Sequence, residues 1–274
     1  MMTEQAPHGV DSTIPNVARI YDYLLGGKDN FAADRAAAGH FLAVIPDIAA
    51  IAADNRAFLA RAVRYLAVEA GIRQFLDLGG GLPTRSNVHQ IAQQAAPDAR
   101  VTYVDYDPVV VRHGEALLAN GRNVAMAHAD LTQPATVLDH PELRRVLDLS
   151  QPLALICTAT LHFVPDEAHP HAVIAEYRDR MAAGSYLVIS HATSSITAGY
   201  SADEAAEAAE EAAAVYRQAS AQLHLRTLTG IRRFFDGFEL VEPGMVWMAE
   251  WRPVPGAGPA GRIKSLYAAV GRKP

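Results

Sequence analysis

The sequence is poor in cysteine, in excess positive charge and in long apolar runs. It has one cysteine, Cys157, in 274 residues, which excludes an internal disulfide framework and a cysteine-based zinc site. The formal net charge is −6, and there is no clustered basic face of the kind that binds nucleic acid. No apolar stretch approaches the roughly 18 residues of a membrane span, and the first residues lack the basic-then-apolar pattern of a secretion signal. We therefore expect a cytoplasmic protein that binds neither nucleic acid nor membrane.

Half of the residues are hydrophobic and a fifth are charged, as in ordinary globular proteins. Residues 1–14 are predicted to be a flexible tail. Residues 15–70 form a helical region, in which apolar residues recur at helical spacing up to about residues 25, 44 and 70. Pro15-Asn16 marks the start of the first predicted helix and Gly26-Gly27 its end. We expect this region to be a cap or lid on the remainder, residues 71–274.

From residue 71 onwards, short apolar runs such as "FLDL", "VTYVD" and "LALIC" alternate with helical stretches. This alternation predicts an α/β fold with a parallel sheet covered on both faces. The last segments, "FELVEP", "VWMAEWRP" and "SLYAAVGR", have only turns or loops between them, so the final strand is expected to be antiparallel. Residues 200–226 are rich in alanine and glutamate and predict an exposed helical insertion.

The stretch "FLDLGGGLPT", residues 75–84, places a glycine loop directly after the first predicted strand. Glycines there allow a tight turn and let a ligand approach bare backbone. The next strand ends in Asp105, 24 residues beyond Gly81, where a carboxylate is suited to accept hydrogen bonds from ribose hydroxyls. Together these features indicate a ligand that contains adenosine.

The spacing within the loop separates two kinds of ligand. A dinucleotide site favours a third glycine where this chain has Thr84, preceded by Pro83. Asp77, at the end of the strand, also suits a pyrophosphate poorly, because a carboxylate favours cationic groups. An ammonium near a sulfonium, as in S-adenosylmethionine, satisfies this preference.

The sequence resembles class I S-adenosylmethionine-dependent methyltransferases. More specifically, it resembles the actinobacterial S-adenosyl methyltransferase family, formerly a domain of unknown function. The resemblance rests on "PNVARIYDYLLGGKDNFAADR", "FLDLGGGLPT", "VTYVDYDPVVV", "ADLTQP", "LHFVPD", "SYLVISHAT" and "FFDGFELVEPGMVWMAEWRP". It implies a Rossmann-like sheet of seven strands with the seventh antiparallel, and a helical N-terminal extension. One departure is Gly80, where the family pattern has a residue such as threonine; we expect this glycine only to loosen the loop.

The resemblance also implies which residues contact the cofactor. Asp77 and the glycine loop would line its methionine half, Asp105 would hold the ribose hydroxyls, and Tyr106 would lie beside the adenine. Asp130 would accept from the adenine amino group, although "ADLTQP" is also typical of a helix cap and turn. The full implied set is Asp77, Gly79, Gly80, Gly81, Asp105, Tyr106, Asp130, Leu131 and Thr158.

The fourth strand ends in "CTATLHFVPD", where many class I enzymes place residues that face the acceptor. His162 is the candidate for a general base or an acceptor-orienting group, and a buried histidine bonded to backbone is the alternative. His191 is a weaker candidate of the same kind. His169 and His171 lack ligand partners at suitable spacing, so no metal site is expected. Trp247 and Trp251 would share one face of an extended strand.

Gly26-Gly27-Lys28 has the composition of a phosphate loop but follows a helical pattern instead of a strand, so a helix end is the simpler interpretation. Because this segment is also the most specific part of the resemblance, we expect residues 16–35 to cover the cofactor. Tyr21 would pack on it, and Lys28 or Asn30 would close over its carboxylate end.

Three functions follow from these patterns. The first is methyl transfer from S-adenosylmethionine to a small-molecule acceptor by in-line displacement, with S-adenosylhomocysteine as the product and a possible place in specialised metabolism. The second is a regulatory or sensing protein that binds the same cofactor without turnover. The third is a nicotinamide-dependent dehydrogenase, which Thr84 disfavours. The acceptor atom, the use of a base and the oligomeric state are left open.

Overall fold

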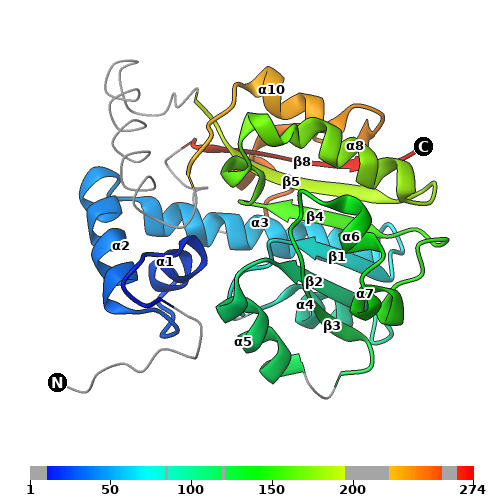
Figure 1. Ribbon diagram of the computed structural model, residues 1–274. Coiled ribbons are helices and arrows are strands. Elements are labelled where there is room, and N and C mark those ends of the chain that lie inside the picture. Colours follow the sequence, from blue (N-terminus) through cyan, green and yellow to red (C-terminus); the bar gives the residue numbers. More distant parts are fainter. Residues whose placement is uncertain (1–10, 84–85, 119–120, 195–221, 255–263) are drawn as a thin grey trace.

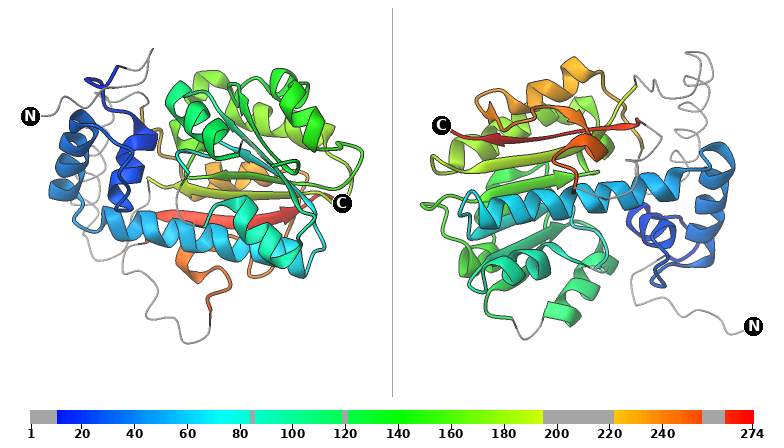
Figure 2. Two further views of the ribbon diagram at one scale, coloured as in Figure 1. Left: turned by 90° about the horizontal axis from the view of Figure 1, so that it is seen from below. Right: turned by 180° about the vertical axis from the view of Figure 1, so that it is seen from behind.

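The computed structural model describes residues 11–83, 86–118, 121–194, 222–254 and 264–274 (Figure 1). Its N-terminal region consists of three helices, which are α1 (Val17–Leu24), α2 (Ala32–Val44) and α3 (Ile48–Val68). Their bounds agree with the helices predicted from apolar spacing. Figures 1 and 2 show that α1 and α2 stand beside the sheet, whereas α3 continues from them along one face of it. We refer to α1, α2 and the first half of α3 as the cap.

Both ends of α1 are fixed by residues that the sequence marks. The Asn16 side chain accepts hydrogen bonds from the backbone N–H groups of Ala18 and Arg19, which caps the start of the helix. At the other end, Gly26 has a φ of 75°. The Gly26 N–H donates to Tyr23 O (2.9 Å) and the Gly27 N–H to Asp22 O (2.8 Å). This is a Schellman motif, so the prediction of a helix end at these glycines is confirmed.

The sheet has the strand order β3-β2-β1-β4-β5-β8-β6, with β7 also paired to β8. Its strands are β1 (Gln74–Leu78), β2 (Arg100–Asp105), β3 (Val124–His128), β4 (Ala154–Thr158), β5 (Tyr186–Ala192), β6 (Glu239–Leu240), β7 (Val246–Trp247) and β8 (Leu266–Arg272). Strands β1 to β5 pair in parallel, and β8 is antiparallel to β5. The prediction of a mainly parallel sheet with the last strand antiparallel is confirmed.

The sixth of the seven expected strands is divided into two short strands, β6 and β7, which lie beside β8 at the edge of the sheet. β6 pairs with residues 271–272 of β8, and β7 pairs with residues 267–268 of the same strand. The chain then leaves the sheet in the 3-10 helix η4 (Met248–Glu250). Trp251 is fully buried with its ring edge-on to Phe58, whereas Trp247 stacks on Tyr267. The prediction that both tryptophans share one strand face is wrong, because the strand ends between them.

Helices cover both faces of the sheet, as continuous burial along β1 requires. One face packs against α3, α4 (Val88–Ala95) and η4, and α5 (Pro108–Leu118) packs on β2 and β3. The other face packs against α6 (Pro134–Leu138), α7 (Pro141–Val146), α8 (Pro170–Arg180) and η3 (Arg233–Phe235). The remaining elements are η1 (Leu161–Phe163), η2 (Asp166–Ala168) and α10 (Leu228–Arg232). Cys157 lies fully buried within β4.

Two features of the sequence analysis concern parts of the chain that are only partly described. The predicted tail 1–14 is described from residue 11, and most of the predicted insertion at 200–226 lies outside the described residues. Within the described residues, no single helix is long and apolar enough to cross a membrane, and α2 and α3 reach that length and hydropathy only as a pair bent by 101°.

Hydrogen bonds between side chains join the cap to the sheet region at two places. The Asn16 amide donates to the carboxylate of Asp107, which itself caps α5 through the Val109 N–H (2.7 Å). Asp107 is therefore a helix cap. At the second place, Ser190 on β5 donates to Asn55 on α3. The cap is thereby fixed over the edge of the sheet where β1, β2 and β4 end.

Candidate cofactor and acceptor site

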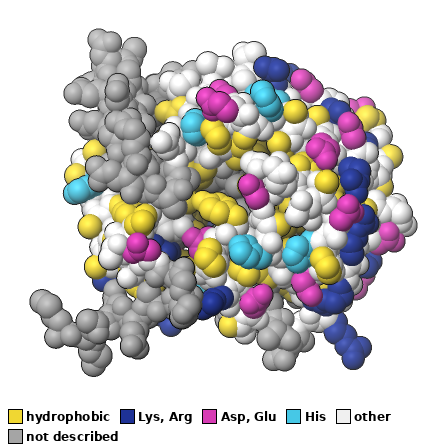
Figure 3. Space-filling model, in the orientation of Figure 1, with side chains coloured by type: hydrophobic (Ala, Val, Ile, Leu, Met, Phe, Trp, Pro, Cys, Tyr) yellow, Lys and Arg dark blue, Asp and Glu magenta, His cyan; other side chains and the backbone are white. Residues whose placement is uncertain are grey.

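A cavity of about 690 Å³ lies between the cap and the carboxyl ends of the parallel strands. It is at the point where the strand order reverses, between β1 and β4, which is the usual place for ligands in open α/β sheets. Hydrophobic side chains gather in the middle of the face shown in Figure 3, with charged ones mainly towards one edge. Of the predicted site residues, those that line the cavity are Tyr21, Asp77, Gly79, Gly80, Gly81, Asp105, Tyr106, Asp130, Leu131, Thr158 and His162.

The glycine loop needs each of its three glycines for a different reason. Gly79 has a φ of 69°, and a Cβ there would lie 2.4 Å from Thr160 Cγ2. Gly81 has a φ of 66° and open space where a Cβ would be, so its backbone faces the cavity directly. A Cβ on Gly80 would lie 2.9 Å from Cδ1 of Tyr103. The expectation that Gly80 only loosens the loop is therefore wrong, because the Tyr103 ring occupies the space.

Asp77 is a buried carboxylate that faces the cavity, with 5% of the residue exposed. No donor among the described residues forms a hydrogen bond with its oxygens. Burial above all, opposed by the Arg56 guanidinium and aided by the Asp105 carboxylate, raises the pKa of Asp77 to about 7. A buried, unpaired carboxylate of this kind is stabilised in its charged form by a cationic ligand group.

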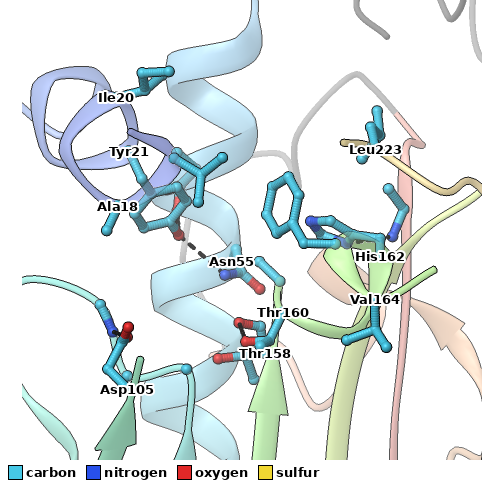
Figure 4. A pocket seen from close by; sticks show the side chains of 18 of the residues that line it. Ala18, Ile20, Tyr21, Asn55, Asp105, Thr158, Thr160, His162, Val164 and Leu223 are labelled. Atoms are coloured by element: carbon cyan, nitrogen blue, oxygen red, sulfur yellow. Dashed lines mark hydrogen bonds between the residues drawn. The ribbon is translucent and has the colours of Figure 1, made fainter. Parts of the chain in front are cut away.

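Asp105 lies at the end of β2 and is bound to the glycine loop. Its Oδ2 accepts from the Gly81 N–H at 3.1 Å, and its Oδ1 accepts from the Asp107 N–H at 3.0 Å. Burial raises the pKa of Asp105, while these backbone hydrogen bonds lower it. The carboxylate is thus held in a fixed orientation at the cavity wall (Figure 4).

Beyond Asp105 the cavity wall becomes more exposed. The Tyr106 side chain is exposed, with 49% of its surface accessible. Asp130 is also exposed, and its Oδ1 accepts from the Thr132 N–H at 2.8 Å, which is the turn geometry named as its alternative role. The Leu131 carbonyl accepts from the Tyr177 hydroxyl at 2.9 Å. No donor among the described residues forms a hydrogen bond with the second carboxylate oxygen of Asp130.

The turn after β4 forms the floor of the cavity between the glycine loop and the part around His162. Ala159 has a φ of 52°, which is unusual for a residue with a side chain. Its N–H donates to Ser190, at 3.1 Å to the carbonyl and 2.9 Å to Oγ. The Thr160 hydroxyl lies 3.0 Å from Thr158 O and 3.2 Å from Leu78 O. These bonds hold a strained turn next to the glycine loop, as is common at functional sites.

The cap contributes a second wall, in which Tyr21 is the central residue. Its hydroxyl donates to Ala52 O at 3.0 Å and accepts from the Asn55 amide at 3.0 Å. Lys28 is exposed, and the Asn30 amide donates to Asp22 Oδ2 at 2.9 Å. The described residues that line the cavity include neither of them. The structure therefore does not bring Lys28 or Asn30 to the site, because the turn at Gly26-Gly27 points Lys28 outward and Asp22 binds Asn30.

Comparison with known proteins identifies this arrangement. A family profile described as S-adenosyl methyltransferase matches residues 3–274. The chain belongs to the S-adenosyl methyltransferase family. A search of curated proteins found no match. Among solved structures, a candidate methyltransferase from Thermobifida fusca is 43% identical, with a TM-score of 0.88 and 99% of each chain covered. A DUF574-family protein from Streptomyces avermitilis is 40% identical, with a TM-score of 0.86, and the match covers 96% of this chain and 99% of that one.

Membership of this family makes the protein a methyltransferase that uses S-adenosylmethionine, in place of the non-catalytic or nicotinamide-dependent alternatives. The cavity fits such a cofactor on its own chemistry. Gly81 leaves open space beside bare backbone, and the buried Asp77 carboxylate accepts no hydrogen bond from the described part of the chain. A ligand that carries an ammonium, hydroxyl groups and a flat heterocycle matches this part of the cavity, which runs from the buried carboxylates of Asp77 and Asp105 to the exposed wall at Tyr106.

Several residues of the site were not predicted. Asn55, Arg56 and Ser190 are apparent only in the structure, although Asn55 carried a signal in the sequence. It is a polar residue on the apolar face of α3, in line with Ile51 and Phe58. A buried polar residue of this kind needs a partner, and here it has two.

His162 and His191 differ in where they lie. His162 lines the cavity, with 6% of the residue exposed. His191 is fully buried behind it, with the two rings 5.5 Å apart. Burial, His191 and Arg226 lower the pKa of His162 well below its usual range. Burial also lowers the pKa of His191 to about 3. Both rings are therefore neutral at physiological pH.

Proposed function

We propose that this S-adenosyl methyltransferase transfers the methyl group of S-adenosylmethionine to a small, mainly apolar molecule, and that the reaction belongs to specialised metabolism. The single observation that carries the proposal is one continuous cavity whose two ends have different chemistry. One end holds Asp77, Asp105 and the glycine loop, and the other is lined mainly by apolar side chains around His162. Its volume of about 690 Å³ is in the upper half of the range for small-molecule sites, about 300–1,000 Å³.

In this proposal the chain binds the cofactor with the residues at the first end. Asp77 accepts from the ammonium group, the Gly79 and Gly81 backbones lie along the methionine half, and Asp105 accepts from the ribose hydroxyls. Tyr106, Asp130 and Leu131 border the adenine. When bound, the cofactor supplies a methyl group on a positively charged sulfur. The protein then has to place the acceptor atom in line with the bond between sulfur and methyl carbon, and it has to exclude water. Helix α1 excludes water by covering the cavity.

Binding of the cofactor is tested by titration calorimetry with S-adenosylhomocysteine. Asp77→Asn and Asp105→Asn should each weaken binding at least tenfold, since each removes a charged acceptor from a buried site. Asp98→Asn is the matched control, because this carboxylate is exposed and pairs with Arg73 at the surface. Unchanged affinity in both site variants would contradict the assignment of these two residues.

The acceptor class is tested by turnover. The enzyme with S-adenosylmethionine is incubated with a panel of aromatic and alicyclic small molecules, with a protein extract and with nucleic acid, and S-adenosylhomocysteine is measured by mass spectrometry. Product formation with members of the small-molecule panel is the expected result. Turnover confined to the protein or nucleic acid samples would overturn the proposal.

A further inference from the structure

The two ring nitrogens of His162 have different surroundings. The backbone N–H of Ala192 donates to Nδ1 at 3.2 Å. Because a backbone N–H can only donate, Nδ1 carries no proton, and the proton of the neutral ring is on Nε2. No described residue forms a hydrogen bond with Nε2. The two nitrogens point to nearly opposite sides of the ring, so the Nε2–H points away from Ala192 while the side chain borders the cavity. His162 lies across the cavity from Tyr21 and Asn55 (Figure 4).

The segment that carries His162 is held rigidly from behind by Arg226. This guanidinium is buried and donates to the carbonyls of Leu161 (2.9 Å) and Val164 (2.8 Å), which flank His162. It also donates to His191 Nε2 (2.9 Å) and to Asp166 (2.6 Å). The His224 N–H donates to the carbonyl of His162 at 2.7 Å. The backbone on both sides of the ring is therefore fixed.

Protonation of His162 is opposed by each group around it. A second ring proton would have to be on Nδ1, where it would meet the Ala192 N–H. The titratable and charged groups that act on the ring are His191 on β5 and Arg226 in the segment before α10, and Arg226 is permanently charged. The ring cannot accept a proton without losing the bond to Ala192. In this tautomer Nε2 carries the proton, so His162 faces a ligand as a hydrogen-bond donor with a fixed direction and not as a base.

The surroundings of the Nε2–H are mainly apolar. The cavity wall at this end includes Phe163, Val164, Leu223 and Leu266. A donor in such surroundings is costly to leave unpaired when a ligand displaces water, so the site favours ligands that supply a lone pair at this position.

We propose that the Nε2–H of His162 donates to an oxygen lone pair, such as that of a carbonyl group or a phenolate, on a mainly apolar methyl acceptor. The inference rests on the proposed function, since it assigns the acceptor to this half of the cavity. It makes His162 a residue that orients the acceptor and selects its chemical class, and it assigns the removal of any proton to another group or to water.

The tautomer is tested directly by nitrogen NMR of histidine in the full-length wild-type protein with S-adenosylhomocysteine. The expected result is a neutral ring protonated at Nε2 that does not titrate between pH 5.5 and 8.5. A ring protonated at Nδ1, or one that becomes charged in this range, would overturn the inference. This measurement needs no substitution at His162.

The recognition is tested by binding of matched probes to the same complex. Acetophenone should bind about tenfold more tightly than ethylbenzene, and 4-nitrophenolate more tightly than nitrobenzene, with the larger preference identifying the carbonyl or the phenolate as the better match. His162→Leu should remove both preferences. His162→Gln should retain part of them, because its amide is also a donor.

The controls separate this inference from the proposed function. Affinity for S-adenosylhomocysteine is measured in the wild type and in both variants. Failure of the wild type to bind it would overturn the cofactor assignment, whatever the probes do. If the wild type binds S-adenosylhomocysteine normally but shows no preference among the probes, only the role of His162 is overturned. The same holds if His162→Leu keeps the preference of the wild type.

Discussion

Ser190 on strand β5 donates a hydrogen bond of 2.6 Å to the amide oxygen of Asn55 on helix α3. Asn55 in turn donates to the Tyr21 hydroxyl, and Ser190 Oγ accepts from the N–H of Ala159. The chain of hydrogen bonds runs from α1 through α3 to the strained turn on the floor of the cavity. The position of the cap and the shape of the site are therefore physically connected.

The bond between Asn55 and Ser190 should appear as an energetic coupling. Asn55→Ala and Ser190→Ala should each lower the free energy of unfolding by about 1–3 kcal/mol, because each leaves buried polar groups unpaired. The double variant should lose less than the sum of the two, since both changes remove the same bond. Urea unfolding measures all three. Ser150→Ala, which removes a hydroxyl bonded at the surface, is the control, and strict additivity would show that the two residues are not coupled.

A side chain at Gly79 should clash with Thr160, and a second substitution at Thr160 should relieve part of that clash. Gly79→Ala places a Cβ 2.4 Å from Thr160 Cγ2 at a positive φ, so we expect a loss of about 2–4 kcal/mol in stability and weaker cofactor binding. Thr160→Ser removes that methyl group and should restore part of the loss in the double variant. Thermal unfolding and calorimetry measure both effects. If Thr160→Ser gives no recovery, steric contact with Thr160 is not the cause.

Asp77 should make both stability and cofactor binding depend on pH. Its pKa of about 7 in the folded protein is above its ordinary value. The folded state therefore holds this proton more tightly, so the contribution of Asp77 to stability is full below about pH 4 and is lost as the pH rises through 7. Asp77→Asn should flatten this part of the stability curve in urea unfolding across pH 4 to 8.

Cofactor affinity should depend on pH in the opposite direction to stability, because the ammonium group of the cofactor favours the ionised Asp77 carboxylate. Affinity should fall by up to about tenfold per pH unit below 7, and binding at pH 6.5 should release a proton. Calorimetry in two buffers with different ionisation enthalpies detects this release. Asp77→Asn should abolish it and Asp98→Asn should not. Equal proton release in wild type and Asp77→Asn would assign it to another group, such as Asp105.

Tyr21 and Lys28 belong to the same segment but should behave differently. Tyr21→Leu removes a cavity wall and two hydrogen bonds, so we expect S-adenosylhomocysteine affinity to fall at least fivefold. Lys28→Ala should stay within about twofold of wild type, because Lys28 is exposed. Titration calorimetry measures both. A comparable loss in Lys28→Ala would show that this side chain closes over the ligand, and unchanged affinity in Tyr21→Leu would remove α1 from the proposed site.

Much of the sheet edge could be predicted because its residues follow local rules. Asp77, the glycine loop and Asp105 come directly after consecutive strands, and the carboxyl ends of parallel strands meet at one edge of a sheet. The helix end at Gly26 and the cap at Asp107 likewise depend on a few neighbouring residues. The end of strand β7 between Trp247 and Trp251 could not be predicted. An extended strand and a strand that ends in a 3-10 turn share the same apolar pattern.

The sequence by itself determined the fold class, the cofactor-binding edge and the family, since strand and helix periodicity and short loop motifs act over a few residues. The tertiary structure decided what each side chain faces. It turned Lys28 outward, placed Tyr103 against Gly80 and brought Ser190 to Asn55 across 135 positions of the chain. It also fixed the protonation of His162 through the Ala192 N–H on a neighbouring strand. Such contacts depend on packing between distant elements, which no local pattern records.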